Sequence, residues 1–164
     1  MHDCLVKGEA MAMLRMALRS VAATGLSFWL AACTGMGDPS APSASREVIF
    51  PAGATPGATP FSPGIRVGST IYVSGQVAGE AGPDIQAQTS AVLKKVVAIV
   101  EAAGSSRSLV DKCTVFLTRQ SDFAGMNEAW RAAFPSMPPA RSTVIVAALA
   151  RQDFLIEVDC SAHV

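Results

Sequence analysis

The chain has few of the residues that bind metals or nucleic acids. Its only histidines are His2 and His163, and no two cysteines are spaced as Cys-x-x-Cys. Zinc sites are built from such clusters, so we expect no metal site. Basic and acidic residues balance at 13 each, without a basic stripe, and aromatic residues make up 6% of the chain. A nucleic-acid surface needs clustered positive charge, so we expect no RNA or DNA partner.

The first 32 residues have the pattern of an export signal. Arg15 and Arg19 precede an apolar run from Val21 to Ala32, and the next residue is Cys33. Small residues followed by cysteine, after a short apolar segment, are typical of a bacterial lipoprotein signal peptide cleaved before that cysteine. The run is shorter than the ~20 residues that a transmembrane helix needs. An ordinary signal peptide, or an uncleaved anchor with a coincidental cysteine, is the alternative.

Residues 33–45 are mostly glycine, proline, serine and alanine. Such a segment cannot build a core, and we expect a flexible tether. Thr34, rather than aspartate, follows the cysteine, which suits sorting to the outer membrane of a Gram-negative bacterium. We therefore expect an exported protein on the periplasmic side, with Cys33 lipidated and the lipid as its sole contact with the membrane.

Residues 46–164 form the pattern of one α+β domain. Asp84 is placed to cap a helix whose apolar stripe includes Ile85, Val92, Val96 and Ile99 and which ends before Gly104. A second amphipathic helix is predicted between residues 121 and 134, with Phe123, Met126, Trp130 and Phe134 on its apolar face. Strands are predicted at 46–50, 64–67, 70–75, 109–118 and in two segments after Pro139. Two helices against one mixed sheet predict a two-layer domain with both helices on one face.

The last two predicted strands each carry one ionised side chain. Arg141 opens the run Thr143-Val144-Ile145-Val146, and Glu157 lies within Leu155-Ile156-Glu157-Val158. Charges are costly in apolar strands unless they are paired or used. A guanidinium can hold a carboxylate through two parallel hydrogen bonds, and a glutamate can take a proton from water. We expect the two strands to be neighbours, with Arg141 and Glu157 opening into one cavity; a salt bridge between them is the alternative.

Several short motifs occur in an order that resembles the RidA/YjgF family of enamine/imine deaminases. They cover about residues 46–164: Arg46-Glu47-Val48-Ile49-Phe50, Pro60-Phe61-Ser62-Pro63, Ile65-Arg66-Val67-Gly68, Tyr72-Val73-Ser74-Gly75-Gln76, Gln88-Thr89, Val100-Glu101-Ala102-Ala103-Gly104, Val115-Phe116-Leu117-Thr118, Asp122-Phe123, Met126-Asn127-Glu128 and Pro139-Ala140-Arg141-Ser142. The resemblance implies a chorismate-mutase-like (YjgF-like) fold. It also implies a homotrimer around a central barrel, with ligand sites between neighbouring subunits.

The resemblance assigns roles to several residues. Arg141 would bind the substrate carboxylate, and Glu157 would activate water. Asn127 would line the pocket, although a helix-to-loop hydrogen bond is an equal alternative for an amide beside an apolar stripe. Ser74 and Gly75 would form the pocket wall, where a glycine lets a ligand approach the backbone, unless Gly75 simply serves a β-bulge.

Two further pocket residues depart from the family pattern. Phe61 stands where many members have tyrosine; its ring can stack on a planar ligand but cannot donate a hydrogen bond. Thr143 stands where one branch has cysteine. The family's sheet order would also place the strands of Cys113 and Cys160 side by side, which makes a disulfide possible in an exported protein. We favour two buried thiols, because disulfide geometry is demanding.

The function that follows is hydrolytic deamination of 2-imino or enamine acids to a 2-keto acid and ammonia, as in a 2-iminobutanoate/2-iminopropanoate deaminase. An imine already hydrolyses in water, so positioning and proton transfer suffice and no cofactor is needed. The alternative is a membrane-tethered module that binds a small carboxylate, such as a keto acid, without turnover. An endoribonuclease, a label also attached to the family, fits poorly, because no histidine stands in a suitable place.

Overall fold

The structure is a computed structural model that describes residues 45–164. The predicted signal peptide, Cys33 and all of the predicted tether except its last residue lie outside the described residues. None of the helices within 45–164 is long and apolar enough to cross a membrane. The domain predicted from residue 46 onward is thus the part whose architecture follows.

Six strands and two α-helices build this domain, with three short 3-10 turns between them. In chain order they are β1 (Arg46–Ile49), β2 (Gly64–Val67), β3 (Thr70–Gln76), α2 (Ile85–Ala102), β4 (Val110–Leu117), α3 (Phe123–Ala133), β5 (Ala140–Ile145) and β6 (Ile156–His163). Each of these elements was predicted from the sequence to within a few residues.

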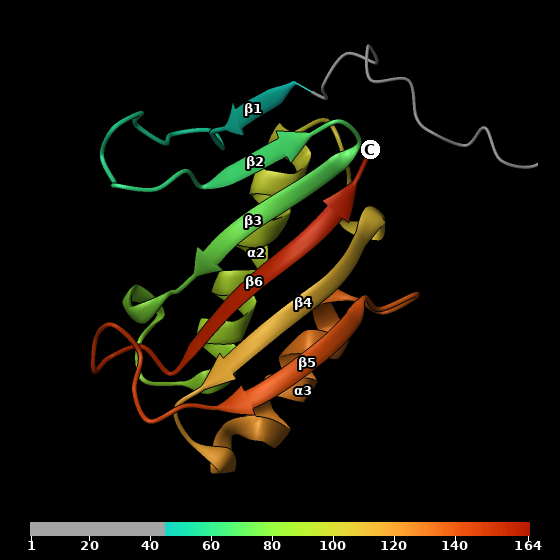
Figure 1. Cartoon of the computed structure of the whole chain (residues 1–164). Helices are drawn as coiled ribbons and strands as arrows, with labels where there is room; N and C mark the ends of the chain where they lie inside the picture. The colour runs from blue at the N-terminus through green and yellow to red at the C-terminus, as the bar shows by residue number, and fades with distance from the viewer. Residues whose placement is uncertain (1–44) are drawn as a thin grey trace, which may run out of the picture. The chain divides into compact units, whose positions relative to one another are not determined.

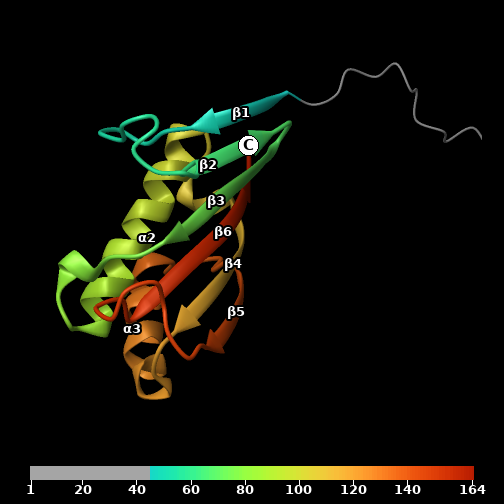
Figure 2. The same cartoon turned by 60° about the vertical axis from the view of Figure 1, so that its left-hand side comes forward.

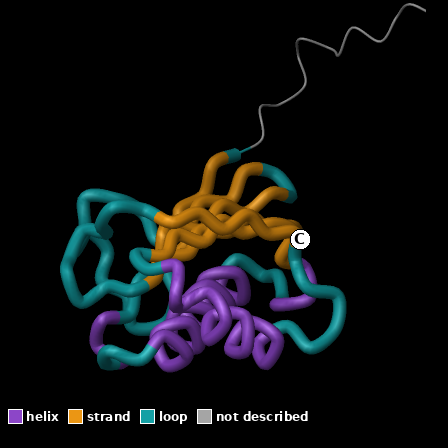
Figure 3. The backbone as a smooth tube through the Cα atoms, turned by 90° about the horizontal axis from the view of Figure 1, so that it is seen from below, coloured by secondary structure: helices purple, strands orange, loops and turns teal. Residues whose placement is uncertain are grey.

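The strands form one sheet in the order β1-β2-β3-β6-β4-β5 (Figure 1). The β4–β5 pair is parallel and every other pair is antiparallel. Helix α3 supplies the crossover that a parallel pair requires. Both helices cover the same face of the sheet (Figure 3), as the two-layer α+β prediction requires.

Helix α2 runs beneath the middle of the sheet (Figure 2) because its sequence has one apolar face and clear end signals. The Asp84 carboxylate accepts a hydrogen bond of 2.8 Å from the Ala87 backbone N–H, which caps the first turn. Val92 and Val96 are fully buried against the strands. Gly104, with φ of +83°, follows the helix in the left-handed conformation expected there.

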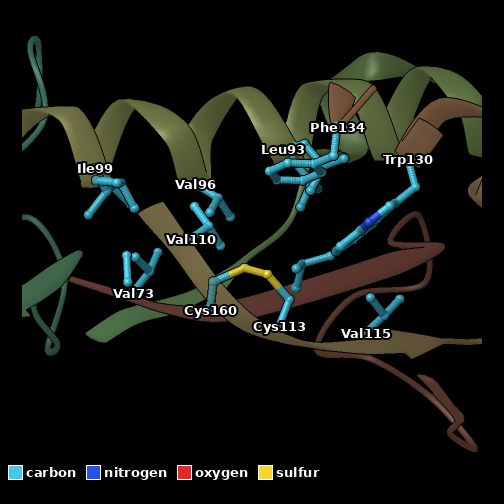
Figure 4. Close-up of a cluster of buried hydrophobic side chains, with 14 of the residues drawn as sticks. Val73, Leu93, Val96, Ile99, Val110, Cys113, Val115, Trp130, Phe134 and Cys160 are labelled. Carbon is cyan, nitrogen blue, oxygen red and sulfur yellow. A yellow bond between two sulfur atoms is a disulfide. The ribbon is translucent and has the colours of Figure 1, made fainter. Parts of the chain in front are cut away.

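A disulfide joins the two central strands. Cys113 on β4 and Cys160 on β6 stand directly opposite each other, with a Cα–Cα distance of 4.1 Å, and are bonded through their sulfur atoms. The bridge lies under the helices among Val96, Val110 and other core side chains (Figure 4). The family's sheet order had placed these strands side by side correctly. Our preference for two free thiols was wrong, because the antiparallel register brings the two cysteines into one cross-strand pair.

The expectation that Arg141 and Glu157 lie on neighbouring strands was also wrong. Strand β4 lies between β5 and β6 and pairs with both. The short connection from β5 to β6 therefore passes over the end of β4 rather than forming a hairpin. The cause is the crossover through α3, which places β5 on the outer side of β4 while β6 fills the gap beside β3.

Replacing Cys113 with Ala and Cys160 with Val should lower the free energy of unfolding. Loss of a native cross-link costs about 2–4 kcal/mol, because the unfolded chain gains conformational freedom. Urea unfolding of the oxidised protein and of the double variant would measure the difference. A reducing agent should lower the stability of the natural protein alone. Equal stabilities, or two free thiols by mass spectrometry, would contradict the bridge.

Candidate functional site

Arg141 lies on the helix-facing side of β5, the edge strand of the sheet. It pairs across the sheet with Cys113, whose side chain is fully buried under the helices, so both point to the same face. Its guanidinium donates a 2.6 Å hydrogen bond to the side-chain oxygen of Asn127 and a 3.3 Å hydrogen bond to the sulfur of Met126. It also lies 4.8 Å from the ring centroid of Trp130. Helix α3 thus holds the guanidinium on three sides.

The guanidinium of Arg141 has no acidic partner within residues 45–164. Each of the ion pairs in this part of the chain is made by another basic residue. Burial lowers the pKa of Arg141, and the positive charge of Arg131 lowers it further. The group remains protonated at neutral pH, since an arginine titrates far above it. A half-buried cation with an aromatic ring beneath it and no counter-charge is suited to bind an anion.

Two other predicted residues lie beside this cation. Asn127 uses its oxygen for Arg141, and its side-chain N–H2 group has no hydrogen-bond partner among the residues of the described domain. Thr143 follows Arg141 by two residues on the same face of β5 and lines a hollow with Ser121, Phe123 and Ile145. The structure joins Arg141 to Asn127 by a hydrogen bond and places Thr143 on the same face of β5. We call these three residues the cationic half-site.

Glu157 lies on the other face of the sheet. It pairs with Phe116, which alternates on β4 with the fully buried Val115 and Leu117 and so points away from the helices. The Glu157 carboxylate lies directly over Gly75, where an added Cβ would overlap one of its oxygens. Only glycine leaves room for the carboxylate at this position. Gly75 also lies in an irregularity of the β3–β6 pairing, between Val73 and Gln76, so the β-bulge alternative holds as well.

The pKa of the Glu157 carboxyl is raised above its ordinary value. Partial burial is the main cause, because it disfavours the charged form, and the negative charge of Asp159 on the same face adds to it. A general base benefits from such a shift, because it brings the pKa closer to the working pH. Arg141, whose positive charge would oppose this rise in pKa if it were nearby, lies on the other face of the sheet.

Ser74 precedes Gly75 on β3, whereas Phe61 lies in a hollow that is also lined by Lys95 and Ala98 of helix α2 and not by Glu157. The Ser74 hydroxyl donates a 2.6 Å hydrogen bond to the Ser62 carbonyl, which holds the segment after Phe61 beside β3. Phe61 is 57% exposed and lines a hollow with Pro63, Gly75 and other residues. The Ser74 backbone N–H is also bonded, to the carbonyl of Pro63, so these two donors are occupied within the chain. We call Ser74, Gly75 and Glu157 the acidic half-site; of these three residues, Gly75 alone also lines the Phe61 hollow.

The two half-sites do not form one cavity within a single chain. Arg141 and Glu157 lie on opposite faces of the sheet and on strands separated by β4. Their register positions are also three residues apart, which puts them roughly 10 Å apart along the strands and about the same distance across them. One small ligand cannot therefore touch both groups of a single chain.

Sequence reasoning missed two contacts of Arg141. Met126 and Trp130 were assigned to the apolar face of the second helix, and both are indeed buried. The Met126 sulfur and the Trp130 ring nevertheless meet the guanidinium directly. The available signal was the position of Trp130, which follows Met126 by four residues and Asn127 by three and therefore neighbours both on the helix surface.

Comparison with known proteins gives a family. The family model described as endoribonuclease L-PSP matches residues 52–164. A RutC family protein of Pyrococcus horikoshii is 40% identical over 124 residues, which are 72% of this chain and 98% of that protein. A RutC family protein of Saccharolobus solfataricus is 38% identical over 124 residues, with the same shares of the two chains.

Solved structures give the same result. The YjgF gene product of E. coli is 36% identical with a TM-score of 0.65, and the match covers 71% of this chain and 98% of that one. E. coli TdcF, solved with bound serine, is 35% identical with a TM-score of 0.66, and the match covers 72% of this chain and 98% of that one. The chain therefore belongs to the YjgF/RutC family, which the matching family model describes as endoribonuclease L-PSP.

Proposed function

We propose that the protein is a hydrolytic deaminase of 2-imino or enamine acids. The observation that carries this proposal is the half-buried guanidinium of Arg141, which no carboxylate within residues 45–164 neutralises. A substrate carboxylate would supply the missing charge through two parallel hydrogen bonds. The TdcF relative binds serine, whose carboxylate is a ligand of that kind.

The cationic half-site of one subunit and the acidic half-site of its neighbour together form the proposed pocket. Family resemblance implies a trimer, and the sheet face opposite the helices supports an assembly. Tyr72 and Val144 lie on that face and are 54% and 42% exposed. Apolar side chains gathered on an uncovered sheet face favour contact with another copy.

The reaction needs only groups that the chain supplies. Arg141 holds the carboxylate. The side-chain N–H2 group of Asn127, whose oxygen already accepts a hydrogen bond from Arg141, lies beside it. Glu157 takes a proton from a water molecule whose oxygen forms a bond to the imine carbon. The proton passes to the nitrogen, which gives a carbinolamine. Glu157 then takes the hydroxyl proton and delivers it to the nitrogen, the carbon–nitrogen bond breaks, and ammonia leaves as the carbonyl of the 2-keto acid forms. Orientation of the water and proton transfer account for the rate.

A non-catalytic binding module is the second candidate, and Phe61 favours it. The phenyl ring contributes apolar surface to the pocket but no proton donor. The same clamp would then hold a keto acid without turnover. Ligand binding by the natural protein without ammonia release would support this candidate.

RNA cleavage, which the family description suggests, has less support. His163 is the one histidine within residues 45–164, and it pairs with Asp111 at 2.9 Å. It lies at the end of β6 remote from Glu157. No basic surface was expected from the balanced charge of the chain.

We propose further that the protein is exported and lipid-anchored at Cys33. The Cys113–Cys160 disulfide supports an oxidising compartment, because such bonds persist mainly outside the cytosol. The usual cytosolic sources of imino acids would then be absent, so the substrate must arise from a different reaction that oxidises or dehydrates amino acids.

Exchange of subunits between two inactive variants tests the shared pocket. Arg141→Ala and Glu157→Ala should each lose about 10²-fold or more in kcat/KM for ammonia release from an enzymatically generated imino acid. When subunits of the two variants are randomly reassembled, most trimers are mixed and each mixed trimer has one complete site. About a quarter of the natural activity should return.

Both variants must remain folded trimers for this result to be read, which circular dichroism and size-exclusion chromatography would establish. Mixing each variant with itself is the matched control and should restore nothing. Full activity of Glu157→Ala would contradict the catalytic role. Two inactive variants that show no recovery in proven mixed trimers would contradict a pocket shared between subunits.

The activity should fall as the pH is lowered through the raised pKa of Glu157. The base must be ionised to accept a proton, so the acidic limb of kcat/KM should lie above the ordinary range of a glutamate, about 4.3. Asp159→Asn removes a like charge, lowers the pKa of Glu157 and should move this limb to lower pH. Asp111→Asn, which changes a carboxylate remote from Glu157, is the control and should leave the acidic limb in place. If Asp159→Asn does not move the acidic limb either, the limb does not report ionisation of Glu157.

Lipid attachment should depend on Cys33 alone. The full chain, produced in a Gram-negative host, should incorporate labelled palmitate and partition into detergent, because acyl chains bury many methylenes. Cys33→Ser should abolish both, while Cys4→Ser, which removes the other N-terminal cysteine, should change neither. Natural protein without label would contradict the lipid anchor.

A further inference from the structure

Gln88 is a fully buried polar side chain on α2 with three hydrogen bonds. Its side-chain nitrogen donates to the carbonyl of Gly82 at 2.7 Å and to the carbonyl of Asp153 at 2.8 Å. Its side-chain oxygen accepts from the backbone N–H of Leu155 at 3.0 Å. A single amide thus links helix α2 to the loop after β3 and to the loop before β6.

These two loops are packed directly against each other. A Cβ added at Gly79 would overlap the Asp153 carboxylate and lie 3.0 Å from the Phe154 ring. The Arg151 guanidinium holds both oxygens of Asp153 at 2.9 Å and lies over the Phe154 ring. The loop before β6 is therefore compact in itself, and Gln88 is the side chain that ties it to the helix layer.

Leu155 is fixed through both of its backbone groups. Its N–H is held by Gln88, and its carbonyl accepts the backbone N–H of Thr118 at 3.1 Å. Glu157 follows two residues later. No hydrogen bond or ion pair within residues 45–164 holds the Glu157 carboxylate, which rests on Gly75 by contact alone. Its direction is therefore set by the backbone at the start of β6.

We propose that Gln88 is a positioning residue for Glu157. By fixing the Leu155 amide it sets where β6 begins and so aims the carboxylate over Gly75 toward the attacking water. This inference rests on the proposed deaminase function, because it assigns Gln88 a role in that reaction. A displacement of about 1 Å in a catalytic group can cost about 10²-fold in rate, so the three hydrogen bonds of a distant amide are sufficient to matter.

Two substitutions separate positioning from stability. Gln88→Met keeps the volume but removes all three hydrogen bonds. Gln88→Glu keeps an oxygen for the Leu155 N–H but loses both donors and puts an oxygen against two carbonyls, so it should destabilise the fold at least as much. If Gln88 positions Glu157, kcat should fall about tenfold or more in Gln88→Met and clearly less in Gln88→Glu, with KM within about threefold in both.

Gln86→Met is the matched control. Gln86 lies on the same helix and donates a 2.6 Å hydrogen bond to Glu128, but it does not contact the loop before β6. Its kcat should stay within about twofold of the natural value. The proposal would be overturned if the more destabilised of the two Gln88 variants had the lower kcat, whether or not it kept the hydrogen bond to the Leu155 N–H.

A measurement without substrate distinguishes failure of this inference from failure of the proposed function. Carbon-13 NMR of the glutamate carboxyl groups, assigned with Glu157→Gln, reports the pKa of Glu157 directly. In Gln88→Met this pKa should move down toward the ordinary value, because the carboxylate leaves its half-buried position. An unchanged pKa would overturn the positioning role. Absence of ammonia release by the natural protein, with the pKa moving as expected, would overturn the deaminase but not the link between Gln88 and Glu157.

Discussion

The chemistry of this domain depends on one unneutralised guanidinium. Removing a charge from water is costly unless new partners replace the solvent. Arg141 receives an amide oxygen, a sulfur and the face of Trp130, yet no carboxylate from residues 45–164. These contacts orient the cation without cancelling its charge. The proposed substrate carboxylate would supply the missing charge, and the fork geometry of the guanidinium suits a carboxylate.

The sheet itself explains why Arg141 and Glu157 of one chain do not open into one cavity. The row that runs from Arg141 through Cys113 and Cys160 faces the helices, and the disulfide fixes its register at the centre. Glu157 belongs to the opposite face. Since a strand alternates its side chains strictly, no local adjustment can bring the two groups to one side. The proposed pocket therefore combines the edge strand β5 of one copy with the Glu157 face of another.

The sequence was sufficient for the elements and for the identities of the charged residues. The cap at Asp84, the buried stripe through Val92 and Val96 and the break at Gly104 are local features, and each appears as predicted. Strand neighbours and faces depend on pairing between distant segments, so β5 and β6 were wrongly expected to be neighbours, and two free thiols were wrongly preferred to the disulfide. The helical period placed Trp130 on the core-facing side of its helix. It could not show that the Trp130 ring would contact Arg141 on a strand.

The proposed reaction explains why the buried polar groups of the domain are used for orientation. Imine hydrolysis has a modest barrier, so accurate placement of a base and a carboxylate supplies most of what an enzyme must add. Asn127 uses its oxygen to hold Arg141, and Gln88 uses its whole amide to hold the segment before Glu157. Phe61 and Thr143 add shape rather than proton transfer. In such a pocket Glu157 is the one group of the two half-sites that can act as a base, so whatever fixes its carboxylate also fixes the rate.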